Sequence, residues 1–125
     1  AAVFSFDESH ATLCERLAEI GLDPRPLVAA GSLHMRQVDP VEFSPGEFEH
    51  LVRLAVERDR ARLIVFDSLN GYMNAMPAER HLVAQLHELL AYLANRGVVS
   101  LLIIGQRGMV GTALEAPVDA SYLSD

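Results

Sequence analysis

The chain has 125 residues, of which half are apolar, and a formal charge of −7, which suits one domain with a buried core. It contains no lysine, and its arginines are scattered, so we do not expect this segment to bind nucleic acid. A single cysteine, Cys14, excludes an internal disulfide and favours a reducing, cytoplasmic setting. The histidines have no metal-ligand spacing, the longest apolar run, 98–104, is too short to cross a bilayer, and no signal peptide is visible.

The first third of the chain predicts a strand, two helices and a second strand. Residues 1–6 are an apolar run that stops at polar residues, which is typical of a buried strand. Apolar side chains at helical spacing predict a helix over 9–20, and the Asp-Pro pair at 23–24 predicts a short helix that runs to Ala30. Residues 33–38 alternate between apolar and polar side chains and predict a strand with one less covered face.

The remainder predicts two longer helices and two buried strands. The Ser-Pro-Gly-Glu sequence at 44–47 has the pattern of a capping box and predicts a helix that ends near Arg58. Residues 62–67 predict the next strand. A stripe of leucines predicts a helix from Pro77 to Gly97, and 98–104 predicts the last strand.

Strands that alternate with helices, and that are apolar along most of their length, indicate a mostly parallel sheet with helices on both faces. The fold class is therefore predicted as α/β with three layers. Two long segments, 68–76 and 105–117, are predicted as loops. Both follow strands, and ligands of open parallel sheets bind beyond the carboxyl ends of the strands.

Three of the four predicted strands end in polar residues that could carry chemistry. Asp7 and Glu8 follow the first strand, Asp67 and Ser68 the third, and Gln106 the last. Two carboxylate sites and an amide could hold Mg²⁺, orient a water and sense a phosphate, as nucleotide hydrolysis requires. Taken alone, each has a simpler explanation, because an aspartate after a strand often only caps a turn and Gln106 could merely bond a loop.

Taken together, these segments resemble a known family. Phe-Ser-Phe-Asp-Glu-Ser at 4–9, Leu-Ile-Val-Phe-Asp-Ser-Leu at 63–69 and Gly-Gln at 105–106 are similar to the KaiC-like branch of the RecA superfamily. The similarity extends through Ala-Pro-Val-Asp at 116–119 and Ser-Tyr-Leu-Ser-Asp at 121–125, and so covers essentially the whole chain. It implies a RecA-like P-loop NTPase core that is incomplete at its N-terminus.

The resemblance also implies a role for each candidate residue. Asp67 corresponds to the Walker B aspartate, which holds Mg²⁺ through water, with Ser68 beside it. Glu8 corresponds to the general base that orients the attacking water. Asp7, its acidic neighbour, stands where the family usually has the first of two glutamates, which leaves its role open. Gln106 corresponds to the sensor of the γ-phosphate.

Three further positions near the end of the chain bear on function. Arg107 could reach the nucleotide of a neighbouring subunit as an arginine finger. Ser121 falls at the first of two adjacent phosphorylation positions of the family, but Tyr122 occupies the second. A full autophosphorylation cycle is therefore not expected, and Ser121 is interpreted as a surface residue.

The phosphate-binding loop of such a domain is not in these residues. No G-x-x-x-x-G-K-[ST] motif occurs, and without a lysine the P-loop lysine is excluded. We therefore interpret 1–125 as one partial domain that alone neither binds ATP tightly nor hydrolyses it. The resemblance implies that the full-length protein binds ATP and Mg²⁺ and assembles as a hexameric ring. It also implies that the protein could act as an autokinase or with protein partners in signalling.

Two alternatives remain. The chain could be a non-catalytic α/β interaction or assembly module that uses its acidic sheet edge and the 105–117 loop to bind a protein partner. A receiver-like phosphoacceptor domain would also place acidic residues at strand ends, but it requires a lysine after a late strand. The absence of lysine disfavours that interpretation.

Overall fold

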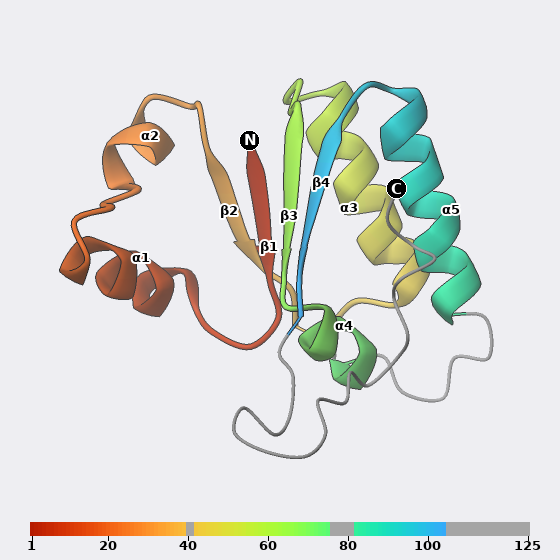
Figure 1. Cartoon of the computed structure of the whole chain (residues 1–125), viewed down its shortest axis with the longest axis horizontal. Coiled ribbons are helices and arrows are strands. Elements are labelled where there is room, and N and C mark those ends of the chain that lie inside the picture. The colour runs from red at the N-terminus through yellow and green to blue at the C-terminus, as the bar shows by residue number, and fades with distance from the viewer. Residues whose placement is uncertain (40–41, 76–81, 105–125) are drawn as a thin grey trace, which may run out of the picture.

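A four-stranded parallel sheet forms the centre of the molecule (Figure 1). The computed structural model describes residues 1–39, 42–75 and 82–104. The strands are β1 (Ala2–Ser5), β2 (His34–Gln37), β3 (Leu63–Asp67) and β4 (Val99–Ile103). Their spatial order is β2-β1-β3-β4, and every pair is parallel, which confirms the predicted sheet.

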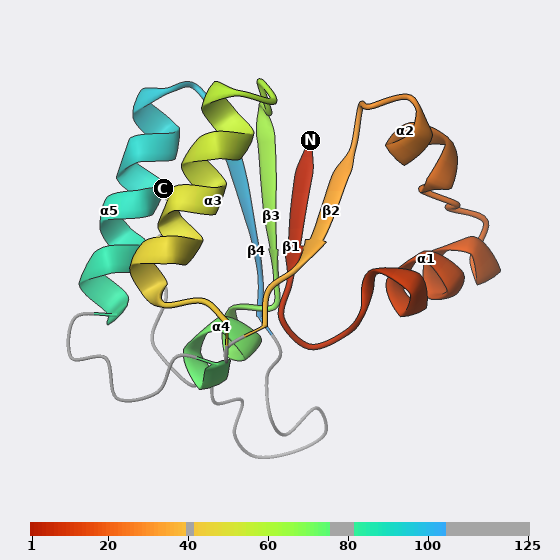
Figure 2. The ribbon, with the colours of Figure 1, turned by 180° about the vertical axis from the view of Figure 1, so that it is seen from behind.

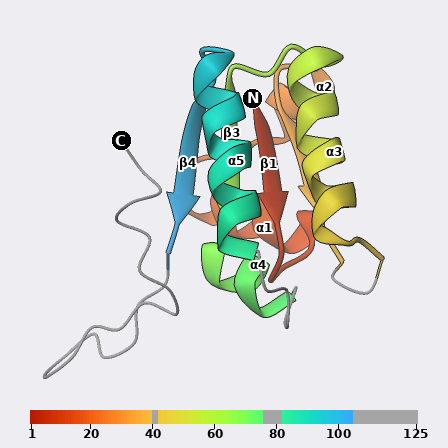
Figure 3. The ribbon, with the colours of Figure 1, turned by 90° about the vertical axis from the view of Figure 1, so that its right-hand side faces the viewer.

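Helices lie on both sides of this sheet, as the apolar strands predicted. The helices of the described residues are α1 (His10–Glu19), α2 (Arg25–Ala29), α3 (Pro45–Glu57), α4 (Leu69–Ala75) and α5 (Leu82–Asn95). Figures 1 and 2 show α1 and α2 on one side of the sheet and α3 and α5 on the other. In Figure 3, α3 and α5 lie in front of the strands, and α4 lies beyond one end of the sheet. The molecule therefore has three layers.

Two predicted helix starts are confirmed by their caps. Ser44 Oγ accepts a hydrogen bond from the Glu47 N–H at 3.2 Å, which is the N-cap bond of the predicted capping box, and it donates one to Glu47 Oε1 at 3.2 Å. Ser9 Oγ accepts from the Thr12 N–H at 3.1 Å at the start of α1. Such caps satisfy backbone N–H groups that have no partner within the helix.

The prediction of a loop over 68–76 was wrong, because α4 occupies most of that segment. The sequence Asn70-Gly71 resembles a turn, but burial decides the outcome. Leu69 and Tyr72 are each only 2% exposed and pack into the core. Tertiary packing therefore outweighs the local preference for a turn.

An aromatic cluster fills the core between the sheet and α3. Phe48 of α3 is fully buried, and its ring centroid lies 5.4 Å from that of Phe4, 5.2 Å from Phe6, 5.7 Å from Phe66 and 5.3 Å from Tyr72. Most of these contacts are edge-on or tilted, the geometry that the ring quadrupoles favour. The cluster joins both central strands to α3 and α4, and so fixes the position of the residues that follow those strands.

One side of β4 is not covered in the same way. Val99, Leu101 and Ile103 alternate along this edge strand and are 59%, 50% and 46% exposed. The predicted coverage of both faces thus does not extend to this part of the sheet. None of the helices in the described ranges combines the length and hydropathy that crossing a bilayer requires.

Candidate functional site

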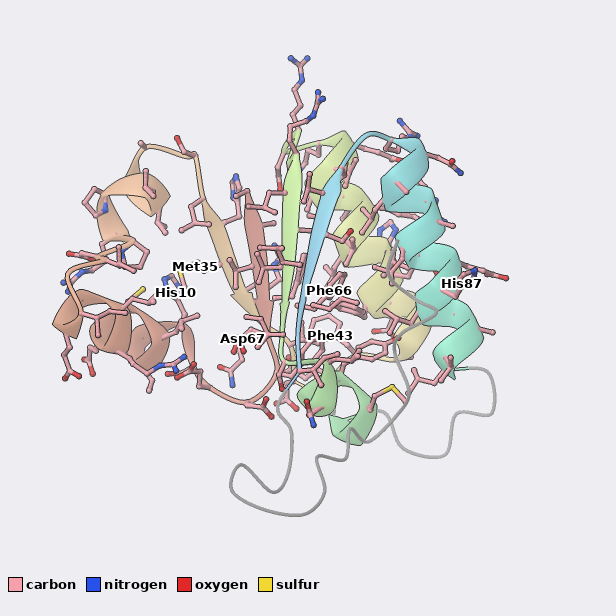
Figure 4. The ribbon with its side chains drawn as sticks, in the orientation of Figure 1. His10, Met35, Phe43, Phe66, Asp67 and His87 are labelled. Atoms are coloured by element: carbon pink, nitrogen blue, oxygen red, sulfur yellow. The ribbon has the colours of Figure 1, made fainter. Side chains whose placement is uncertain are left out.

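The parallel register of β1 and β3 places two of the predicted acidic segments next to each other. Ser5 is the register partner of Asp67, and the Phe6 N–H donates to the Asp67 carbonyl oxygen at 2.9 Å, which extends the pairing by one residue. Asp7 and Glu8 therefore leave the sheet beside Asp67 and Ser68. Figure 4 shows Asp67 at the end of β3 that lies near α4. The predicted convergence at the carboxyl edge of the sheet is confirmed for these two strands.

Asp7 is held by the first turn of α4. The Ser68 hydroxyl donates to Asp7 Oδ2 at 2.8 Å, and Ser68 Oγ in turn accepts from the Gly71 N–H at 3.1 Å. A Cβ atom on Gly71 would lie 2.7 Å from Asp7 Oδ2 and 2.7 Å from Phe6 Cβ, closer than nonbonded heavy atoms pack. Only glycine lets the carboxylate approach the helix so closely.

Glu8 is oriented by a different element. Its Oε1 accepts from Arg16 Nη2 of α1 in an ion pair, and its carbonyl oxygen accepts from the Ser5 hydroxyl at 2.8 Å. The Arg16 side chain is 59% exposed, whereas that of Glu8 is 23% exposed. An ion pair with one well solvated partner is worth at most about 1 kcal/mol, so Glu8 can exchange Arg16 for another partner at little cost.

The electrostatics of this edge favour a cation. Within the described ranges, neither Asp7 nor Asp67 forms an ion pair with an arginine or histidine. Carboxylates that follow adjacent strands repel each other unless a positive charge lies between them. No group of three or more His, Cys, Asp or Glu side chains that could hold a metal occurs in those ranges. Carboxylate oxygens are ligands that Mg²⁺ can take, and such sites are usually completed by water and phosphate oxygens.

Several predicted residues lie outside the described residues. They are Gln106, Arg107, Ser121, Tyr122 and the segment 105–117. Their predicted roles therefore stay predictions. The structure does give the position of the strand that precedes Gln106. This strand, β4, pairs with β3 so that Ile103 is the register partner of Asp67.

Three residues that shape the site were missed by the sequence analysis. Gly71 was interpreted as part of a loop, although Ser68 followed by Gly71 at the third position fits a helix N-cap. Arg16 lies in no motif, and Ser5 lies within the 4–9 segment but was given no role of its own. Their roles depend on contacts that the fold creates. Only the role of Arg16 could have been predicted, because it is a cation on the helix that directly follows the acidic pair.

Comparisons with known proteins bear on the fold. No protein-family model matches the sequence, and no curated protein matches it. Among solved structures, a KaiC-like protein from the hyperthermophilic archaeon Pyrococcus horikoshii OT3 superposes with a TM-score of 0.72 over 89% of this chain, at 20% sequence identity. The match covers 49% of that protein, so this chain spans about half of its length. The chain therefore has a RecA-type α/β fold, like the corresponding half of that KaiC-like protein.

Proposed function

We propose that this chain is the C-terminal portion of a KaiC-like ATPase whose full-length form binds and hydrolyses ATP with Mg²⁺. The observation that carries the proposal is the meeting of Asp7 and Glu8 with Asp67 and Ser68 at one edge of the sheet. In an open parallel sheet this edge is the ligand-binding edge. The shared fold with a KaiC-like protein supports the same assignment.

Each residue has a role that its surroundings suit. Asp67 would hold Mg²⁺ through water, and the bound ion would neutralise charge on the phosphates. Ser68 donates its proton to Asp7, and one of the two lone pairs on its oxygen accepts from Gly71. The other lone pair can accept one further hydrogen bond at the edge. Glu8 would first break its ion pair with Arg16 and would then orient the attacking water.

Asp7 has a positioning role in this proposal. Its carboxylate accepts the Ser68 hydroxyl proton and lies against Gly71, so it connects the end of β1 to the segment that follows β3. A glutamate would carry its carboxylate one methylene farther. The shorter side chain matches the limited space beside α4.

The proposal needs a phosphate-binding loop that the 125 residues do not contain. The carboxylates at this edge would repel a triphosphate unless backbone N–H groups and a lysine offset its charge. The exposed side of β4 offers a surface on which a further strand and helix of the same domain could pack. A Walker A motif encoded upstream of Ala1 would support the proposal, and its absence there would contradict it.

The catalytic test uses a longer polypeptide that includes such an upstream segment. We expect Glu8→Gln to lower kcat for ATP by about 10²- to 10⁴-fold, because a general base is lost. The matched control is Glu88→Gln on α5, an exposed position with the same change of charge. Equal turnover in the two variants would remove Glu8 from this role.

A non-catalytic binding module is the second candidate. One observation favours it, since Arg16 already occupies the Glu8 carboxylate. In that case the acidic edge would contact a protein, and the longer polypeptide would assemble without turning over ATP. The ATPase proposal also includes a cytoplasmic hexameric ring, the assembly that the resemblance implies. Sedimentation of the longer polypeptide with and without ATP would measure its size.

A further inference from the structure

A second candidate site lies at the opposite end of the strands, between the edge strand β2 and the C-terminal half of α3. We name it the β2–α3 groove. Its walls are formed by His34 and Arg36 on the strand side and by Leu51, Leu54, Arg58 and Asp59 on the helix side. The groove is partly open to solvent.

The groove carries positive charge on a protein whose overall charge is −7. His34 and Arg36 share one face of β2, because they are two residues apart, and they pair in register with Ala2 and Phe4. Two arginines and one aspartate line the groove, so its net charge is positive.

The arginines of the groove have N–H groups that do not bond to Asp59, the acidic residue of the groove. Arg58 Nε donates to Asp59 Oδ1 at 2.9 Å, and Arg58 Nη2 lies 3.4 Å from Asp59 Oδ2, which leaves three N–H groups of Arg58 free of that pair. Within the described ranges, Arg36 forms no ion pair. The Arg58 hydrogen bond lowers the pKa of Asp59, and the charge of Arg36 acts in the same direction, so both arginines lie within electrostatic reach of Asp59.

From this geometry we propose that the β2–α3 groove binds a small phosphate monoester. The phosphate would be held by Arg36 and by the free donors of Arg58, since planar guanidinium groups match phosphate oxygens. Leu51 and Leu54 would contact the organic part of the ligand. The site is separate from the acidic edge, because it opens near the first residues of β1 and β2, whereas Asp67 ends β3.

The ligand class follows from size and charge. A nucleic-acid strand needs a row of cations along its backbone, whereas this groove has two arginines and one histidine in a small space. A simple carboxylate would satisfy fewer donors than a dianionic phosphate. An apolar wall beside the cations favours an ester over the free ion.

The test is a titration of the 125-residue chain followed by ¹H–¹⁵N NMR, at constant ionic strength, with phenyl phosphate, inorganic phosphate and benzoate. We expect saturable shifts at the amides of His34, Arg36 and Arg58, with phenyl phosphate the tightest of the three. Arg36→Gln should weaken phenyl phosphate binding by about tenfold, the loss of one charge-assisted hydrogen-bonding group.

Two further variants make the test decisive. Arg25→Gln removes the same charge from an arginine that is paired with Asp23 on another element, and it should leave binding unchanged. Leu54→Ala should reduce the advantage of phenyl phosphate over inorganic phosphate. Shifts spread over the whole chain, equal loss in Arg36→Gln and Arg25→Gln, or tighter binding of benzoate would overturn the proposal.

Discussion

Replacing Gly71 with alanine tests whether the Asp7 carboxylate is packed against α4. The added Cβ would lie 2.7 Å from Phe6 Cβ and 2.7 and 2.8 Å from the two Asp7 oxygens, whereas nonbonded carbon atoms prefer about 3.5 to 4.0 Å. The Asp7 side chain can rotate away from the methyl group. Phe6 Cβ cannot, because it is attached directly to the backbone of a residue that is buried in the aromatic cluster.

The expected magnitude combines two opposing effects. Overpacking of a well-packed site costs about 1–3 kcal/mol, and replacing glycine by alanine within a helix returns up to about 1 kcal/mol. We therefore expect Gly71→Ala to lower the free energy of unfolding by about 1–2 kcal/mol. Urea denaturation followed by circular dichroism measures this difference.

Gly46→Ala on α3 is the matched control. There the nearest atom to the added Cβ is Ser44 Oγ at 4.0 Å, an ordinary contact, so this variant should be as stable as the wild type or slightly more stable. In the double variant Asp7→Ala/Gly71→Ala, the loss should be smaller than the sum of the two single losses, because the contact with the carboxylate is gone. If Gly71→Ala proves as stable as Gly46→Ala, the close approach of Phe6 and Asp7 to α4 is refuted.

Three further predictions concern the frame of the site. Phe48→Ala should lower the free energy of unfolding by about 3–5 kcal/mol, measured by urea denaturation, because it empties the centre of the aromatic cluster; a loss below about 1 kcal/mol would contradict that role. Ser44→Ala should cost about 1 kcal/mol by removing the cap of α3, and Ser44→Asp should restore stability. Burial and the hydrogen bond to Glu57 raise the pKa of Tyr92 above its ordinary value, so its stabilising effect is complete below about pH 10 and is lost as pH rises through the raised pKa. The stability difference between the wild type and Tyr92→Phe should therefore shrink as the pH rises above about 10, the ordinary pKa of tyrosine, and a constant difference would refute this assignment.

Much of the fold could be predicted because local signals and tertiary packing agree. The capping box at Ser44 and Glu47 predicted the start of α3, and the hydrogen bonds of the structure match it. Apolar spacing predicted α1 and α5 in the same way. The start of α2 differs from the prediction by one residue, since the helix begins at Arg25 and not at Pro24. Asp23 accepts a hydrogen bond from the Arg25 N–H from just outside the helix.

The candidate site was predicted in its residue types and only partly in its geometry. Asp7 and Asp67 are 60 positions apart in the sequence, and their proximity depends on β1 and β3 being neighbours in the sheet. The pattern of apolar runs indicates a parallel sheet, but it does not give the order of the strands. Resemblance to a family supplied the expectation that these strand ends act together.

The sequence by itself determined that this is an α/β protein with acidic residues after its strands, because the period of apolar residues and the helix caps are local properties of the chain. The tertiary structure alone decided that 69–75 is a helix, that Gly71 admits the Asp7 carboxylate, and that Arg16 pairs with Glu8. The physical reason is that each of these outcomes depends on atoms brought together from distant segments. Burial of Leu69 and Tyr72, which no local pattern reports, then fixes the helix on which the site is built.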